Sequence, residues 1–231
     1  MSAIYSTEET LRRDLARYSG WIAQLGFAPG TSGNLSARLD RYRLLVTPTG
    51  MSKRFLKPED MVVVGLDGQL LAGDRNATSE LSMHLAIYRL RDDVHAVIHS
   101  HPPIATAFAC SGRGLDDRLC QEAIMTLGSV PLALYATTGT DEVAASLTPF
   151  IPGHDAILLE NHGSVTCGAS VLEAFLRTET LEHLAQVTLA CHQLGSPRRL
   201  SATEVAQLQH ARMKYAANAA AVDDHQLCMP G

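Results

Sequence analysis

Cysteine is scarce and unpatterned in this chain of 231 residues. Its five cysteines include no C-x-x-C pair, so the sequence predicts neither a disulfide framework nor a zinc site built on thiolates. Most of them have apolar or small neighbours, where cysteine usually serves as a small hydrophobic residue. Any metal chemistry must therefore come from other side chains.

Long apolar runs and clusters of positive charge are missing as well. No segment approaches the length of a membrane span, and the charged residues within 8–13 argue against an apolar signal region. The net charge is −5 and no basic run is longer than a pair, which argues against a nucleic acid as partner. We expect a cytoplasmic protein with no membrane and no nucleic acid among its partners.

The sequence does contain an ordinary globular composition, 46% hydrophobic and 19% charged, over a length that suits one core. We expect a single domain over 1–231, with a core at about 8–215 and a short C-terminal tail. Periodicity predicts helices over 7–26, 79–91, 105–110, 141–149, 170–194 and 201–219, and strands over 35–39, 43–47, 61–66, 94–101, 130–134, 156–159 and 165–167. This alternation predicts an α/β fold with a sheet covered by helices.

His99 and His101 stand two residues apart after an apolar run, within the predicted strand 94–101. On an extended strand both rings leave the same face, so both can reach one ion. The alternative is a solvated pair on an edge strand. His162 follows the predicted strand 156–159, at a strand end where a cleft can open. The remaining histidines occur singly and are interpreted as structural: His84, His95, His154, His183, His192, His210 and His225.

Glu80 provides an acidic group near the start of the predicted helix 79–91. There it either complements the helix dipole or belongs to the metal site, as a ligand or as a base. Three imidazoles and one carboxylate suffice to hold a divalent ion. A metal with an exchangeable position polarises a carbonyl group, and a neighbouring carboxylate can then move a proton.

Three polar segments offer backbone N–H groups and hydroxyls to an anion: 30–34 (GTSGN), Thr49 with Gly50, and Thr78 with Ser79. None carries a positive charge, and the nucleotide fingerprints G-x-x-x-x-G-K-[ST] and G-x-G-x-x-G are absent. Each segment alone is typical of a turn. Beside a metal set, and with Thr78 and Ser79 at a helix N-terminus, they predict a small phosphorylated substrate.

Tyr135 follows the predicted strand 130–134 and precedes a glycine turn. A tyrosine in such a place usually buries part of its ring and leaves its hydroxyl in water. The residues alone therefore assign it no role.

Taken in order, these residues resemble the class II aldolase/adducin-type family. The matching motifs are GTSGNLSAR at 30–38, TPTG at 47–50, Ser79-Glu80 with His84, His99-x-His101, YATTGT at 135–140 and NHG at 161–163. The resemblance implies a three-layer α/β/α fold with a central, largely antiparallel sheet. It also implies assembly as a homotetramer with the sites at subunit interfaces.

The resemblance further implies a zinc-dependent aldolase that reversibly cleaves a ketose 1-phosphate, such as L-fuculose 1-phosphate, into dihydroxyacetone phosphate and an aldehyde. One Zn²⁺ per subunit, or Mn²⁺ or Co²⁺ in its place, would be held by His99, His101, His162 and Glu80. Glu80 would become the acid/base group when substrate displaces it. Tyr135, reaching the site of a neighbouring subunit, would protonate the aldehyde oxygen. The substrate phosphate would be held by Asn34, Thr49, Gly50, Thr78 and Ser79.

Other members of the family leave alternatives open. Epimerases of L-ribulose 5-phosphate use the same metal chemistry but usually carry aspartate at the position of Glu80, so glutamate favours an aldolase. Dehydratases and decarboxylases of related sugar phosphates are further relatives. A non-catalytic, adducin-like interaction domain is the alternative from another class, but such domains tend to lose the metal residues. Thr78 in place of the usual serine and the unmatched segment 223–231 depart from the family pattern.

Overall fold

The computed structural model describes residues 7–115, 118–195 and 197–219. Its centre is one sheet of eight strands in the order β4-β3-β2-β1-β5-β8-β7-β6. Neighbouring strands are antiparallel, except that β6 and β7 are parallel. The strands are β1 (Asn34–Arg38), β2 (Arg43–Val46), β3 (Val62–Gly65), β4 (Leu70–Ala72), β5 (Ala96–Ser100), β6 (Leu132–Ala133), β7 (Ala156–Leu159) and β8 (Gly163–Gly168).

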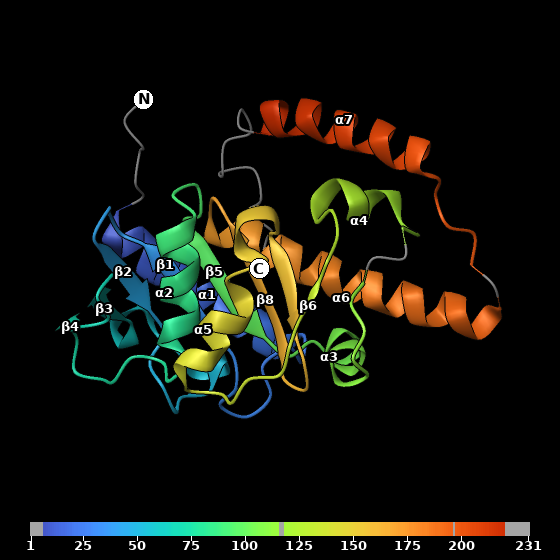
Figure 1. The fold of residues 1–231 in the computed structure, drawn as a ribbon. Helices are drawn as coiled ribbons and strands as arrows, with labels where there is room; N and C mark the ends of the chain where they lie inside the picture. Colours follow the sequence, from blue (N-terminus) through green and yellow to red (C-terminus); the bar gives the residue numbers. More distant parts are fainter. Residues whose placement is uncertain (1–6, 116–117, 196, 220–231) are drawn as a thin grey trace.

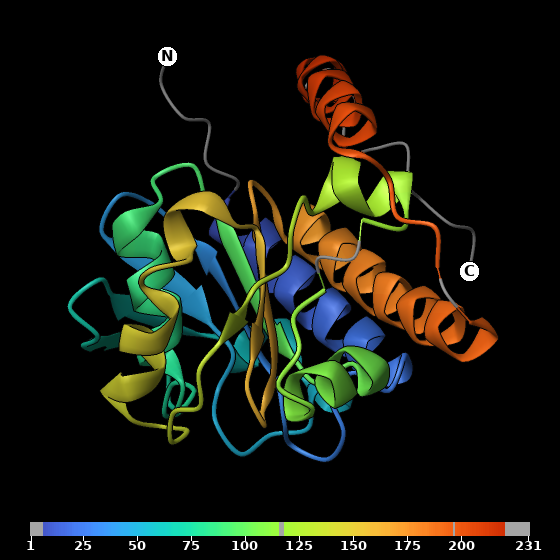
Figure 2. The same cartoon turned by 45° about the vertical axis from the view of Figure 1, so that its right-hand side comes forward.

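Helices cover both faces of this sheet (Figure 1). One face carries α1 (Glu8–Gln24), α3 (Pro103–Cys110) and α6 (Val171–Leu194), and the other carries α2 (Leu81–Leu90) and α5 (Asp141–Leu147). Figure 2 shows α7 (Ala202–Ala219) at the periphery, beyond α4 (Gln121–Thr126). Three short 3₁₀ helices complete the described elements: η1 (Lys53–Phe55), η2 (Pro58–Asp60) and η3 (Ile151–Gly153). The layers confirm the predicted α/β/α fold with a largely antiparallel sheet.

Strand β1 shows how the sheet positions polar groups. All five of its residues are buried. Leu35 and Ala37 join the apolar cluster beneath α1 and α6, whereas the intervening Asn34, Ser36 and Arg38 make hydrogen bonds on the α2 face. The period of two thus produces a buried polar row beneath α2. The row ends at Asn34, which lies opposite His99 in the pairing of β1 with β5.

Most predicted elements are confirmed with small changes of bounds. The predicted helix 79–91 begins at Leu81, and its N-cap is Glu80, whose side chain makes no capping hydrogen bond. The predicted strand 94–101 is shorter, because β5 ends at Ser100 and His101 lies beyond it. Helix α4 has no counterpart among the predictions, since six residues are too few to establish a helical period. The expected tail at 223–231 lies outside the described residues.

Among the described helices, none combines the length and the apolar composition needed to cross a membrane.

Candidate metal centre

Three imidazole rings converge at one end of the sheet. The ligand atoms of His99, His101 and His162 lie within 4.8 Å of one another. His99 belongs to β5, His101 follows it, and His162 lies in the turn between β7 and β8. The structure therefore brings together all three histidines that the sequence pattern indicated.

The turn that carries His162 depends on two backbone positions. Asn161 has φ 58°, a left-handed conformation that asparagine adopts more readily than most residues. A Cβ on Gly163 would clash with the ring of His101 and lie 2.7 Å from the carbonyl oxygen of Ser100. A larger residue at 163 would displace His101. The NHG sequence is thus what allows the rings to meet.

Hydrogen bonding and burial leave the rings ready to act as ligands. Nδ1 of His99 donates to the carbonyl oxygen of Ser164 at 2.9 Å, which orients the ring so that its Nε2 faces the other rings. Burial, with the nearby His99 and His162, lowers the pKa of His101 to about 3, and this ring is neutral. The Nε2 atoms of His99 and His101 are 3.0 Å apart. Two imidazole nitrogens at that distance share a proton in a hydrogen bond or, when neither carries a proton, can both bind one cation.

The Glu80 carboxylate faces two of these rings. Its Oε2 lies 3.3 Å from Nε2 of His99, and its Oε1 lies 3.2 Å from Nε2 of His162. Oε1 is buried and makes no well-aligned hydrogen bond. Burial alone would raise the pKa of Glu80, but the nearby His99 and His162 rings outweigh it and hold that pKa below its ordinary value. The carboxylate is therefore anionic.

These donors fit a divalent metal ion such as zinc. Three imidazole nitrogens and one carboxylate form a donor set that zinc commonly takes in proteins. A cation among these groups would supply the partner that the buried Oε1 of Glu80 lacks, and the close approach of the two imidazole nitrogens suits shared binding of one ion.

A chain of buried hydrogen bonds runs from Glu80 into the core. The side-chain amide nitrogen of Asn34 donates to Oε2 of Glu80 at 2.8 Å. The side-chain oxygen of Asn34 contacts Nε2 of His84 at 2.5 Å, and Nδ1 of His84 contacts Oγ of Ser36 at 2.6 Å. The hydroxyl of Tyr88 lies 2.9 Å from Oγ of Ser36. Every group in this chain has a partner on each side.

His84 is therefore more than an isolated core histidine. It is fully buried, as its structural interpretation requires. Burial, together with His99, lowers its pKa to about 3, so the ring is neutral and donates from one nitrogen while accepting at the other. The sequence offers two weak signals for this role, namely the four-residue step from Glu80 to His84 and the place of His84 in a motif that matches the family.

The three predicted anion loops lie side by side near Glu80. A β-bridge joins Pro48 to Ala77, which immediately precede two of the loops. The N–H of Thr49 donates to the carbonyl oxygen of the residue before Ala77 at 3.1 Å. Asn34, at the end of the third loop, reaches Glu80 directly. The residues expected to bind phosphate are thus grouped at the metal end of the sheet: Asn34, Thr49, Gly50, Thr78 and Ser79.

The loops themselves carry no positive charge, but the structure places one beneath them. Lys53 in η1 is buried, and its Nζ donates to the carbonyl oxygens of Thr31 and Met51. In the sequence Lys53 stands between Ser52 and Arg54, in a polar stretch that is typical of a solvated turn. Its position three residues after Gly50 is the one signal that could have indicated a role.

Tyr135 makes no hydrogen bond or ring contact with the three histidines among the described residues of its own chain. Its side chain is 64% exposed, and its backbone N–H donates to Oε2 of Glu160 at 2.8 Å. The predicted role of Tyr135 as a proton donor therefore depends on a neighbouring subunit.

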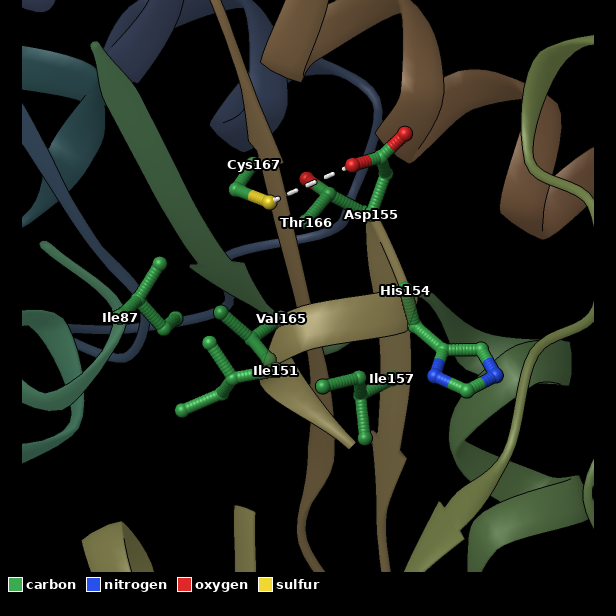
Figure 3. A pocket seen from close by; sticks show the side chains of 8 residues that line it. All are labelled: Ile87, Ile151, His154, Asp155, Ile157, Val165, Thr166 and Cys167. Atoms are coloured by element: carbon green, nitrogen blue, oxygen red, sulfur yellow. Dashed lines mark hydrogen bonds between the residues drawn. The ribbon is translucent and has the colours of Figure 1, made fainter. Parts of the chain in front are cut away.

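A small cavity beneath η3 offers no comparable site (Figure 3). Its volume is about 10 Å³, room for at most one water molecule. Burial raises the pKa of the Cys167 thiol to about 12, so this thiol is protonated and unreactive. Apolar and polar side chains share the lining: Ile87, Ile151, His154, Asp155, Ile157, Val165, Thr166 and Cys167.

Comparison with known proteins agrees with this geometry. The family model described as the Class II Aldolase and Adducin N-terminal domain matches residues 13–189. A 3-oxo-tetronate 4-phosphate decarboxylase of Escherichia coli strain K12 is 36% identical over 216 residues, which cover 90% of this chain and 100% of that protein. An L-fuculose phosphate aldolase of Methanococcus maripaludis is 37% identical over 168 residues, 73% of this chain and 90% of that protein. A solved structure of an L-fuculose 1-phosphate aldolase superposes with a TM-score of 0.83 at 31% identity, over 91% of this chain and 99% of that one.

The helix-covered sheet, the three-histidine site and the similarity to these proteins together define the class of the protein. It is a sugar-phosphate enzyme with a site that fits a divalent metal. The chain belongs to the class II aldolase and adducin family. Its relatives divide between decarboxylases and aldolases of phosphorylated sugars.

Proposed function

We propose that the protein is a zinc-dependent aldolase that reversibly cleaves a ketose 1-phosphate, of the L-fuculose 1-phosphate kind, into dihydroxyacetone phosphate and an aldehyde. The observation that carries the proposal is the anionic carboxylate of Glu80 facing His99 and His162, two members of a group of three histidines. An aldol reaction needs an electrophile for the carbonyl group and a base for a carbon-bound proton. The similarity to two L-fuculose phosphate aldolases supports the same reaction.

Each residue has a distinct task in this reaction. His99, His101 and His162 would hold a divalent ion, and Glu80 would complete the resting site. A divalent ion bound there supplies the electrophile that polarises the substrate carbonyl. In the synthetic direction Glu80 removes the proton from the carbon of dihydroxyacetone phosphate that attacks the aldehyde, and in cleavage it returns that proton. The amide N–H of Asn34 stabilises the carboxylate during the transfer.

The phosphate of the substrate belongs, in this proposal, to the three loops beside Glu80. The hydroxyl of Thr49 and the N–H of Gly50 make no hydrogen bond within the described structure, and both residues are exposed. They are therefore available to an anion. The binding group comprises Asn34, Thr49, Gly50, Thr78 and Ser79.

Decarboxylation of a 3-oxo sugar-acid phosphate is the second candidate, because the relative of that name aligns over its whole length. Loss of CO₂ from a 3-oxo acid needs an electron sink at the carbonyl group and then an acid that protonates the enolate carbon, whereas aldol synthesis needs a base that removes a carbon-bound proton. The anionic Glu80 would also repel the carboxylate of such a substrate. The position of Glu80 therefore favours the aldolase.

Product analysis with three substrates tests the proposal. Metal-loaded protein is incubated with L-fuculose 1-phosphate, with L-ribulose 5-phosphate and with 3-oxo-tetronate 4-phosphate. Release of dihydroxyacetone phosphate from the first supports the aldolase. Release of CO₂ from 3-oxo-tetronate 4-phosphate, with no cleavage of L-fuculose 1-phosphate, would contradict the aldolase and identify a decarboxylase. Conversion of the second to its 4-epimer alone would identify an epimerase.

We further propose that a homotetramer is the working assembly and that Tyr135 completes the site of a neighbouring subunit. The exposure of Leu134 (74%) and Tyr135 (64%) at the end of β6 supports an interface there. A mixture of Glu80→Gln and Tyr135→Phe subunits tests the idea. Each variant alone should be inactive, and mixed assemblies should regain part of the activity. No regain in verified mixed assemblies would refute the shared site.

A further inference from the structure

A buried ammonium group without a carboxylate partner lies beneath two of the anion loops. Lys53 is 1% exposed, and its Nζ donates to the carbonyl oxygens of Thr31 at 3.1 Å and Met51 at 2.5 Å. No described carboxylate forms an ion pair with Lys53. Glu80 acts on it through its charge, but the Glu80 oxygens are directed at the histidines and at Asn34.

The missing counter-charge is physically informative. Removing an ammonium group from water is costly unless an opposite charge compensates for it. Two carbonyl dipoles offset part of that cost, but the third N–H of Lys53 has no partner in the described structure. Burial lowers the pKa of Lys53 to about 8, against the influence of Glu80, so the charged form still predominates at neutral pH. A neutral side chain with N–H groups could donate to the same two carbonyl oxygens without the cost of burying a charge. The charge therefore indicates an anion that the protein itself does not supply.

The position of Lys53 indicates where that anion binds. Thr31 lies in the 30–34 loop, and Met51 directly follows Gly50. The ammonium thus touches the backbone of two of the loops that present unused donors to solvent, among them the N–H of Gly50 and the hydroxyl of Thr49. An anion on these donors would have the positive charge of Lys53 behind it.

We propose that Lys53 is the buried counter-charge for the phosphate group of the substrate. The inference rests on the proposed sugar-phosphate substrate and adds a charged residue to a binding site otherwise made of neutral donors. Lys53 acts from beneath the loops, so it is a positioning residue. Its loss should weaken the binding of phosphate and raise KM, while kcat stays within a few-fold of the wild-type value.

Two substitutions separate the effect of the Lys53 charge from the effect of its hydrogen bonds to the loop carbonyl groups. Lys53→Met removes charge and donors, whereas Lys53→Gln keeps a donor for a loop carbonyl. The Kd of inorganic phosphate for metal-loaded protein should rise at least about tenfold in both variants, because a hydrogen-bonded charge is lost. Lys57→Met is the matched control, an exposed lysine four residues further on, and its Kd should not change. Wild-type phosphate affinity in a folded Lys53→Gln protein would overturn the proposal.

A measurement on the wild-type protein covers the case in which the variants do not fold. With lysine labelled for NMR, the pKa of Lys53 should rise when inorganic phosphate is added to saturation, because an adjacent anion favours the charged form. An unchanged pKa at saturation would overturn the proposal. Neither measurement needs turnover, so the two proposals fail separately. Phosphate binding that depends on Lys53 in a protein without aldolase activity would refute the proposed reaction alone.

Discussion

The side-chain oxygen of Asn34 accepts a hydrogen bond from Nε2 of His84 at 2.5 Å, and this contact decides which end of the Asn34 amide faces Glu80. Because the oxygen is occupied, the amide nitrogen points to the carboxylate, 2.8 Å away. An inverted amide would place its oxygen against an anionic carboxylate. His84 thus orients the donor that stabilises Glu80 while remaining outside the metal site.

This buried histidine makes the protein sensitive to acid. Burial, with a contribution from His99, lowers the pKa of His84 from 6.5 to about 3, so between these values the unfolded chain binds a proton that the folded chain does not. The stabilisation is complete above pH 6.5 and is lost as the pH falls toward 3, with a slope of at most about 1.4 kcal/mol per pH unit for one proton. Urea unfolding of the wild-type protein and of His84→Gln at several pH values measures this dependence of the free energy of unfolding on pH. The variant should be less stable at neutral pH but show the flatter slope. Equal slopes would contradict the assignment.

Removal of one imidazole should abolish metal binding and activity together. His99→Ala and His101→Ala each leave two nitrogen donors where three converge. We expect elemental analysis to find no tightly bound divalent metal in either purified variant, and product assays to find no turnover. His183→Ala, at an exposed position on α6, is the control that should keep both. Full turnover by metal-free His99→Ala protein would rule out a metal-dependent mechanism.

The sequence could indicate candidate metal residues because part of their signal is local. Two histidines at a spacing of two on an apolar strand are directed to the same side, and Glu80 stands out at a helix start. The contact of His162 with them is not local. It depends on β8 lying next to β5 in the sheet, an order that the spacing of residues does not specify. The pattern indicated His162 as a candidate at a strand end, and the resemblance to a family assigned it to the same ion as His99 and His101.

The sequence could not predict the buried partners of the site. His84 and Lys53 look like single polar residues in a helix and in a turn. Their roles arise from contacts with residues that are distant in sequence, Asn34 for His84 and Thr31 for Lys53. Burial of a lone polar side chain is a tertiary property, because it depends on which segments fold over it.

Glu80→Gln tests the proton transfer. The substitution keeps the size of the side chain and removes its negative charge, while the three imidazoles remain. We expect kcat for ketose 1-phosphate cleavage to fall by about 10²- to 10⁴-fold, the usual contribution of a positioned acid/base group, with metal still detectable by elemental analysis. Glu59→Gln, at an exposed position, is the control for charge removal. A Glu80→Gln protein with metal bound and near wild-type kcat would show that another group moves the proton.

Gly163→Ala tests whether the close approach of the β7–β8 turn to His101 positions the metal ligands. A methyl group at 163 would meet the His101 ring and lie 2.7 Å from the carbonyl oxygen of Ser100, so the turn or the ring must move. We expect the free energy of unfolding to fall by about 1–3 kcal/mol, as for other overpacked buried sites, and zinc affinity measured against a chromophoric chelator to fall with it. Gly153→Ala is the matched control, because a Cβ there meets nothing within 4 Å. Because the added methyl group meets the ring of a metal ligand, zinc affinity should change. Unchanged zinc affinity in Gly163→Ala would show that the position of His101 does not depend on this contact.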